Sequence, residues 1–201
     1  MTEHNMSVLR STARLIAVAA TLLIVSACSQ DNVRKVSNAG AQPVLADDTI
    51  EQMFTDALSH LQQEEYDQGI ELLETLTAKE NRLAAPFVNL GIAYSRTGNT
   101  KKAEYSFSRA LRLDAGHAVA NNELGLLYRK TGRFSAAKSA YKNALVKHPD
   151  YLPARKNLGI LCELYLHDME CALEQYQAYL EYAPEEETVA RWALELKQRT
   201  Q

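Results

Sequence analysis

The pattern of apolar and polar positions changes twice along the chain. Residues 15–25 (LIAVAATLLIV) form an uncharged run of eleven, residues 29–48 are polar without a sustained period, and apolar residues recur regularly from residue 50 onward. An apolar run of eleven is too short for a permanent membrane span but matches the core of a signal peptide, and Arg10 and Arg14 precede it. We therefore predict an export signal over residues 1–27.

The residues that follow the apolar run add a second signal. Val25, Ser26, Ala27 and Cys28 resemble the lipobox of bacterial lipoproteins. The resemblance implies that the Cys28 thiol receives a diacylglyceryl group, that cleavage falls after Ala27, and that the new amino terminus is acylated. Several acyl chains, at about 0.8 kcal/mol per buried CH₂, anchor a protein far more firmly than one chain. The alternative is a plain secretory signal in which this cysteine is incidental.

The segment after the cysteine suggests where the protein is held. In lipoproteins an Asp directly after the lipidated cysteine retains the protein at the inner membrane, whereas Ser29 stands there in this chain. This favours a lipid anchor in the outer membrane facing the periplasm, with the inner membrane as the alternative. Residues 28–48 are predicted to be the lipidated N-terminus and a flexible tether, because they are polar and contain Gly40 and Pro43.

From residue 50 the chain repeats itself every 34 residues. The corresponding sets are Leu90, Gly91 and Tyr94, then Leu124, Gly125 and Tyr128, then Leu158, Gly159 and Cys162. Their spacing and residue types resemble the tetratricopeptide repeat. The resemblance implies an all-α, right-handed solenoid of about four helix-turn-helix repeats, in which small residues let two antiparallel helices approach closely.

The terminal repeats depart from the pattern, and a further helix follows them. His60 stands at the tyrosine position of repeat one, and repeat four fits only with one extra residue near 166–169, where we expect a lengthened turn. After Pro184, an apolar stripe that includes Trp192 predicts a capping helix, with this tryptophan buried against repeat four. The predicted array spans 49–185, with repeats at about 50–83, 84–117, 118–151 and 152–185 and a capping helix at 186–201.

In proteins of this family the first helix of each pair lines a concave groove that binds other proteins. The residues that we assign to this groove are Val88, Ile92, Ser95, Arg96, Asn122, Leu126, Arg129, Lys130, Lys156, Ile160 and Glu163. Aliphatic side chains mixed with basic groups suit an extended or helical segment of a partner protein, with acidic residues. The alternative is that Arg96, Arg129 and Lys130 are merely solvated helix ends.

Charge and motif content exclude other classes of function. A formal net charge of −3 supplies no surplus of cations for a nucleic-acid phosphate backbone. The histidines are scattered, and the sequence holds no HExxH motif, no Gly-x-Ser-x-Gly elbow and no phosphate-binding glycine loop. We therefore expect that the protein is not an enzyme, that it uses no cofactor, and that it binds neither nucleic acid nor a small-molecule substrate.

Cys162, His167 and Cys171 form the one cluster of potential metal ligands. A zinc site would need a fourth ligand and two reduced thiols, although exported proteins meet an oxidising compartment. With Cys28 consumed by lipid, Cys162 and Cys171 are the remaining cysteines. A disulfide between them, without a metal, is the prediction.

These observations predict a membrane-anchored protein–protein interaction scaffold in the bacterial cell envelope. The chain is similar to small envelope lipoproteins with tetratricopeptide repeats, such as the type IV pilus pilotins, which implies a role in assembling a pilus or secretion complex. An adaptor for cell-wall enzymes or for an energy-coupling transport system is an alternative. A different class is a soluble exported repeat protein that binds a metal or small ligand near Cys162.

Overall fold

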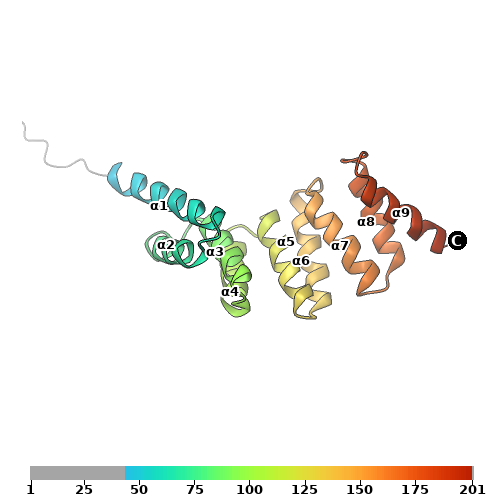
Figure 1. The fold of residues 1–201 in the computed structure, drawn as a ribbon, viewed down its shortest axis with the longest axis horizontal. Helices are drawn as coiled ribbons and strands as arrows, with labels where there is room; N and C mark the ends of the chain where they lie inside the picture. The colour runs from blue at the N-terminus through green and yellow to red at the C-terminus, as the bar shows by residue number, and fades with distance from the viewer. Residues whose placement is uncertain (1–43, 201) are drawn as a thin grey trace, which may run out of the picture. The chain divides into compact units, whose positions relative to one another are not determined.

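The structure is a computed structural model that describes residues 44–200, with side chains from Thr49 onward. In this part of the chain nine α-helices follow one another and no strand is formed (Figure 1). The helices are α1 (Val44–Gln62), α2 (Tyr66–Lys79), α3 (Ala84–Arg96), α4 (Thr100–Leu113), α5 (Ala118–Lys130), α6 (Phe134–Lys147), α7 (Leu152–Leu164), α8 (Met169–Leu180) and α9 (Glu187–Arg199). The predicted all-α class is confirmed.

The N-terminal boundary differs from the sequence prediction. Helix α1 begins at Val44, so the last residues of the predicted tether, 44–48, are helical. The predicted signal peptide, Cys28 and the rest of the predicted tether lie outside the described residues.

Each repeat is a hairpin of two helices, and the hairpins pack in chain order. Within the repeats, α1 packs on α2, α3 on α4, α5 on α6 and α7 on α8. Between the repeats, the second helix of one hairpin packs on the first helix of the next, and α9 packs on α8. None of these nine helices is both long enough and apolar enough to cross a membrane.

Glycine in the first helix allows close contact with an aromatic ring of the second helix. An added Cβ at the glycine would lie within 2.4–2.6 Å of the ring in each of three repeats. The pairs are Gly91 with Phe107, Gly125 with Tyr141, and Gly159 with Tyr176. The rings are at most 1% exposed, so the period of 34 reflects one packing requirement met three times.

The turn inside each hairpin needs one residue in the left-handed region of backbone space. Gly98 (φ 80°) and Gly132 (φ 75°) supply it in repeats two and three, and Glu64 (φ 60°) supplies it in repeat one. Repeat four uses His167 (φ 54°) in a turn of 165–168 that is one residue longer than the others. The predicted lengthening is confirmed.

Two ion pairs join neighbouring repeats at corresponding positions but with opposite polarity. Both guanidinium Nη atoms of Arg133 donate to the Glu104 carboxylate at 2.8 Å, between repeats two and three. Lys138 Nζ donates to Asp168 Oδ2 at 3.0 Å, between repeats three and four. Lys138 follows Glu104 by one period, and Asp168 follows Arg133 by one period plus the inserted residue. The acid therefore belongs to the earlier repeat at the first interface and to the later repeat at the second.

Helix α9 closes the C-terminal end of the array. Its apolar stripe packs on repeat four, with Val189, Ala193 and Leu196 buried. The predicted burial of Trp192 is only partial, since its side chain is half-buried with its ring centroid 5.6 Å from that of Tyr176. Trp192 lies at the margin because α9 is the last described helix and nothing described packs on its outer side.

Candidate functional site

The first helices of the repeats form one continuous surface. Helix α1 contacts α3, α3 contacts α5 and α5 contacts α7, whereas no comparable packing joins α2, α4, α6 and α8 in the described part of the chain. In a curved stack of hairpins the layer whose helices lie closer together is on the inside of the curve. We call the exposed side of α1, α3, α5 and α7 the concave face.

An aliphatic row runs along the concave face at intervals of 34 residues. All of its members are half-buried, so each presents part of its side chain to solvent. The row consists of Leu58, Ile92, Leu126 and Ile160. Three of these residues were predicted from the sequence, whereas Leu58 was not, although it stands one period before Ile92.

The predicted basic groups flank this row. Arg96, Lys130 and Lys156 are exposed, and Arg129 is half-buried with its guanidinium 5.9 Å from the ring centroid of Tyr165. None of these four cations makes an ion pair with a described residue. Their charges are therefore available to a partner.

Two predicted groove residues support the concave face from beneath. Val88 and Asn122 are each only 3% exposed. Val88 packs in an apolar cluster with Phe87, and the Asn122 side-chain oxygen accepts a hydrogen bond of 2.9 Å from Asn157 Nδ2 in the next repeat. The prediction that Val88 and Asn122 line the groove is wrong, because both side chains are buried in the interface with a neighbouring repeat and cannot contact a partner.

Glu123 is a concave-face residue that sequence analysis missed. It is half-buried, and Asn122 Nδ2 donates to its Oε1 at 3.1 Å. Burial raises the pKa of this carboxyl, while the Asn122 hydrogen bond and the charge of Arg96 oppose that rise. Asn89 stands one period before Glu123, and Asn157 stands one period after it. When the repeats are aligned, this position is therefore an acid in repeat three and an amide in repeats two and four.

A depression of about 380 Å³ opens between α1 and α3 on the concave face. Its lining includes Leu58 and Ile92 of the aliphatic row, the cation Arg96 and the acid Glu64. An apolar floor beside a cation suits an aliphatic side chain next to an acidic one.

Two tyrosines at corresponding positions differ in their hydrogen bonds. Tyr176 Oη donates to Glu163 Oε2 at 3.0 Å, and Arg199 of α9 donates to the other oxygen of this carboxylate at 3.2 Å. Tyr141 Oη is buried without a hydrogen-bond partner among the described residues. Burial raises the pKa of Tyr141 to about 12, and the nearby charge of Arg129 opposes the rise.

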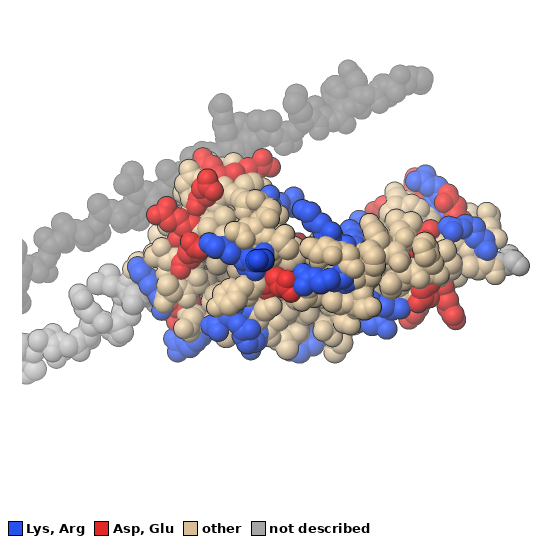
Figure 2. All heavy atoms as spheres, turned by 90° about the horizontal axis from the view of Figure 1, so that it is seen from below, with Lys and Arg blue, Asp and Glu red and all other residues tan. Residues whose placement is uncertain are grey.

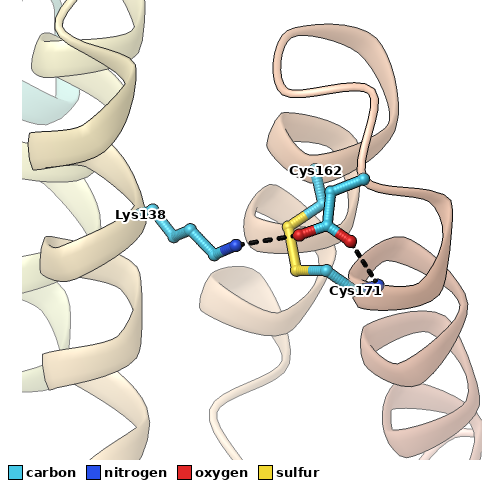
Figure 3. The surroundings of a disulfide bond; sticks show 4 residues. Lys138, Cys162 and Cys171 are labelled. Carbon is cyan, nitrogen blue, oxygen red and sulfur yellow. Dashed lines mark hydrogen bonds and ion pairs between the residues drawn. A yellow bond between two sulfur atoms is a disulfide. The ribbon is translucent and has the colours of Figure 1, made fainter.

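Cys162 and Cys171 form a disulfide that joins the end of α7 to the start of α8, with their Cα atoms 5.9 Å apart. Asp168 lies beside it, since its carboxylate accepts hydrogen bonds from Lys138 Nζ and from the backbone N–H of Cys171. Figure 3 shows Lys138 pointing toward the disulfide from the neighbouring repeat. The third group near the sulfurs is thus Asp168, whereas His167 is exposed. A disulfide offers no thiolate to a metal, so this cluster is a covalent link within repeat four.

Two histidines have local roles in the repeats. His60 Nδ1 lies 2.6 Å from Glu65 Oε2, and it is half-buried at the place where Tyr94 stands in repeat two. His117 caps the start of α5, since its Nδ1 accepts from the backbone N–H of Ala120 at 3.3 Å.

Acidic and basic side chains are mixed on the face of the described chain that is seen from below. Figure 2 shows blue and red side chains interspersed with larger uncharged areas. This face therefore offers a partner no field of one sign.

Comparisons with solved structures support the same architecture. MamA from Desulfovibrio magneticus RS-1 (residues 41 to the end) is 19% identical, with a TM-score of 0.65 over 76% of this chain and 86% of that one. Pseudomonas aeruginosa PilF is 20% identical, with a TM-score of 0.68 over 77% and 71%. A thermophilic TPR protein of Thermus thermophilus is 23% identical, with a TM-score of 0.61 over 74% and 81%. At these identities the likeness is one of fold.

Family comparison gives the assignment. No curated protein matches the chain. The family model described as "Tetratricopeptide repeat" matches residues 54–118 and again residues 122–184, which is more than half of the chain. Together with the hairpins, the glycine–aromatic contacts and the period of 34, this match shows that the chain belongs to the tetratricopeptide repeat family.

Proposed function

We propose that this chain is a protein-binding scaffold of the bacterial cell envelope and that its concave face holds the partner. The observation that carries the proposal is the aliphatic row flanked by cations that have no ion pair among the described residues. Solvated surface lysines and arginines need no apolar neighbour, whereas a binding surface combines apolar contact with charges that select the partner.

The chemistry of the concave face defines the partner's chemistry. Four aliphatic side chains in a line suit a helical or extended segment that presents its own aliphatic residues along one side. Arg96, Arg129, Lys130 and Lys156 suit acidic residues beside that apolar side. We therefore propose a partner segment that combines aliphatic and acidic residues.

A pair of charge reversals tests this surface. Arg129→Glu together with Lys130→Glu should weaken capture of specific partners from solubilised membranes without unfolding the protein, since Lys130 is exposed and the half-buried Arg129 has no ion pair with a described residue to lose. The matched control is Lys101→Glu together with Arg112→Glu, which alters two exposed cations of the second helix α4. If both variants capture the partners equally well, Arg129 and Lys130 do not contribute to partner binding.

The proposed membrane attachment depends on Cys28, which lies in the lipobox-like segment. Cys28→Ser should abolish incorporation of a fatty-acid analogue and release the protein from the membrane fraction. A Cys162→Ser, Cys171→Ser variant is the control, because it removes the other cysteines and leaves the lipobox intact. Unchanged labelling of Cys28→Ser would overturn the proposed anchor. Separation of inner and outer membranes on a density gradient tests the proposed outer-membrane location.

Assembly of a pilus or secretion complex is the process that we propose for this scaffold. Its likeness to Pseudomonas aeruginosa PilF is a likeness of fold, so the proposal depends on which proteins the concave face captures. Capture of secretin or pilus subunits, lost in the double charge reversal, supports it. Capture of cell-wall enzymes or of transport components would instead support the adaptor role.

A further inference from the structure

A groove of about 540 Å³ lies between the second helices α6 and α8. Lys138 of α6 and Cys171 of α8, both labelled in Figure 3, belong to its two sides. Leu145 and Leu158 give it apolar lining, together with Val146, which is 77% exposed. The concave face is formed by the first helices, so this groove is a separate surface.

Gln175 of α8 is a buried polar residue in the lining of this groove. It is only 6% exposed, and its side-chain amide makes no hydrogen bond with a described residue. Among the described side chains, Tyr141 Oη is the polar atom that is sealed from solvent without a partner. The unpartnered amide of Gln175 is therefore not sealed, and it contacts solvent in the groove that Gln175 lines.

Packing of the repeats does not require a glutamine at this position. Ser106 corresponds to Gln175 in repeat two and Ala140 corresponds to it in repeat three, and both are buried. The Ser106 hydroxyl donates to the backbone oxygen of Lys102 at 2.9 Å, and Ala140 has no polar side chain. Since ordering a long side chain and withdrawing its amide from water both cost free energy, a ligand explains Gln175 better than the fold does.

The two sides of the groove carry opposite charges. Lys142 lies on the α6 side, and Glu170 and Glu174 lie on the α8 side. All three side chains are exposed, and none makes an ion pair with a described residue. A ligand that carries an acidic group toward α6 and a basic group toward α8 complements these charges.

We propose that this groove binds an extended segment of a partner protein and that Gln175 pairs with one peptide group of that segment. A primary amide has N–H donors and a carbonyl acceptor, so it matches the C=O and the N–H of a peptide group. A helix uses these groups in its own hydrogen bonds, whereas an extended segment leaves them free to pair. The opposite charges of Lys142 and Glu174 select a segment with an acidic and a basic residue, and Val146 offers contact to an aliphatic one. This site adds a second binding surface to the concave face.

Selected peptides test the proposal on the full-length protein. Random peptides of about 12 residues displayed on phage are first depleted on the Gln175→Ala protein and then selected on wild type, so that binders of other surfaces are removed. The surviving peptides should bind Gln175→Ala roughly tenfold more weakly than wild type, because two hydrogen bonds are lost. The matched control is Gln177→Ala, which alters an exposed glutamine of the same helix and should leave the affinity unchanged.

Methylation of the peptide backbone tests the pairing itself. Each peptide nitrogen of a binder is methylated in turn, which removes one N–H donor. Methylation at one position should weaken binding to wild type several-fold and should have less than about a twofold effect on Gln175→Ala, as in a double-mutant cycle. Circular dichroism checks that Gln175→Ala is folded, as the alanine at the corresponding position of repeat three leads us to expect.

Each outcome decides between occupants of the groove. If no peptide survives the depletion, the Gln175 amide is only solvated and the proposal is wrong. If surviving peptides depend on Gln175 but no methylation shows coupling to it, a helix or a side chain occupies the groove and the extended segment is wrong. Neither result bears on the concave face, which the charge reversals test separately.

Discussion

At the scale of single residues, three aromatic rings share one packing position and differ in what surrounds their outer ends. Phe107 has no hydroxyl, Tyr176 donates its hydroxyl to Glu163, and the Tyr141 hydroxyl has no partner among the described residues. The position of each ring follows from the period of 34. Its polar surroundings depend on Arg129 or Glu163, which the repeat pattern does not constrain.

Removing the two hydroxyls should have different effects on stability. Tyr141→Phe deletes a buried donor that lacks a partner, so the free energy of unfolding should stay the same or rise by up to about 1 kcal/mol. Tyr176→Phe deletes a donor to a carboxylate and should lower it by about 1.5 kcal/mol. Urea unfolding of both variants measures this. Equal destabilisation by the two substitutions would contradict the difference in hydrogen bonding.

The raised pKa of Tyr141 also predicts how stability changes with alkaline pH. The unfolded phenol loses its proton near pH 10 and the folded one near pH 12, so folding is favoured below pH 10 and this contribution is lost as the pH rises toward 12. The loss amounts to about 1.4 kcal/mol per pH unit for one proton. Unfolding titrations between pH 9 and 12 should show a shallower decline for Tyr141→Phe than for wild type, and parallel curves would argue against the burial of this phenol.

At the scale of helices, the disulfide of repeat four lies at the position where a tyrosine and a lysine contact each other in repeat two. Lys102 Nζ lies 3.1 Å from the Tyr94 hydroxyl and 4.8 Å from the centre of its ring. Cys162 stands two periods after Tyr94, and Cys171 stands two periods plus the inserted residue after Lys102. The covalent link therefore holds the hairpin with the longest turn at a place where another repeat relies on polar contact.

Replacing both cysteines by alanine should destabilise the C-terminal end of the array selectively. Closing a loop of about ten residues contributes about 2–3 kcal/mol in the chain-entropy model. Because each repeat contacts only its neighbours, amide exchange should accelerate in α7, α8 and α9 and change little in α1–α4. Wild-type protein with its disulfide reduced is the control and should behave like the variant. Uniform acceleration along the chain would contradict local stabilisation.

The two interfacial ion pairs make a charge-swap experiment feasible. Arg133→Glu should lower the free energy of unfolding by about 0.5–1 kcal/mol, because it places two carboxylates together at a partly exposed site. Adding Glu104→Lys should restore most of that loss by recreating the polarity of Lys138 and Asp168. Urea unfolding of the single and double variants gives the coupling, and additive effects would show that the pair does not stabilise the interface.

At the scale of the whole molecule, the sequence predicted the architecture better than the surface. The hairpins, the extra residue near His167 and the C-terminal helix followed from packing residues that recur in register. The roles of Val88 and Asn122 did not, because a first helix turns some positions toward solvent and others toward the next repeat. The extension of α1 over residues 44–48 was also missed, since five residues are too few to show a helical period.

The opposite polarity of the two ion pairs has a consequence for how this gene can change. Tandem repeats of equal length are prone to unequal recombination, which removes or duplicates whole units. Loss of residues 118–151 would bring Glu104 against Asp168, and duplication of the same unit would bring Lys138 against a second Arg133. Each product would carry like charges at the new junction. The opposite polarity of the two pairs thus disfavours loss or duplication of repeat three.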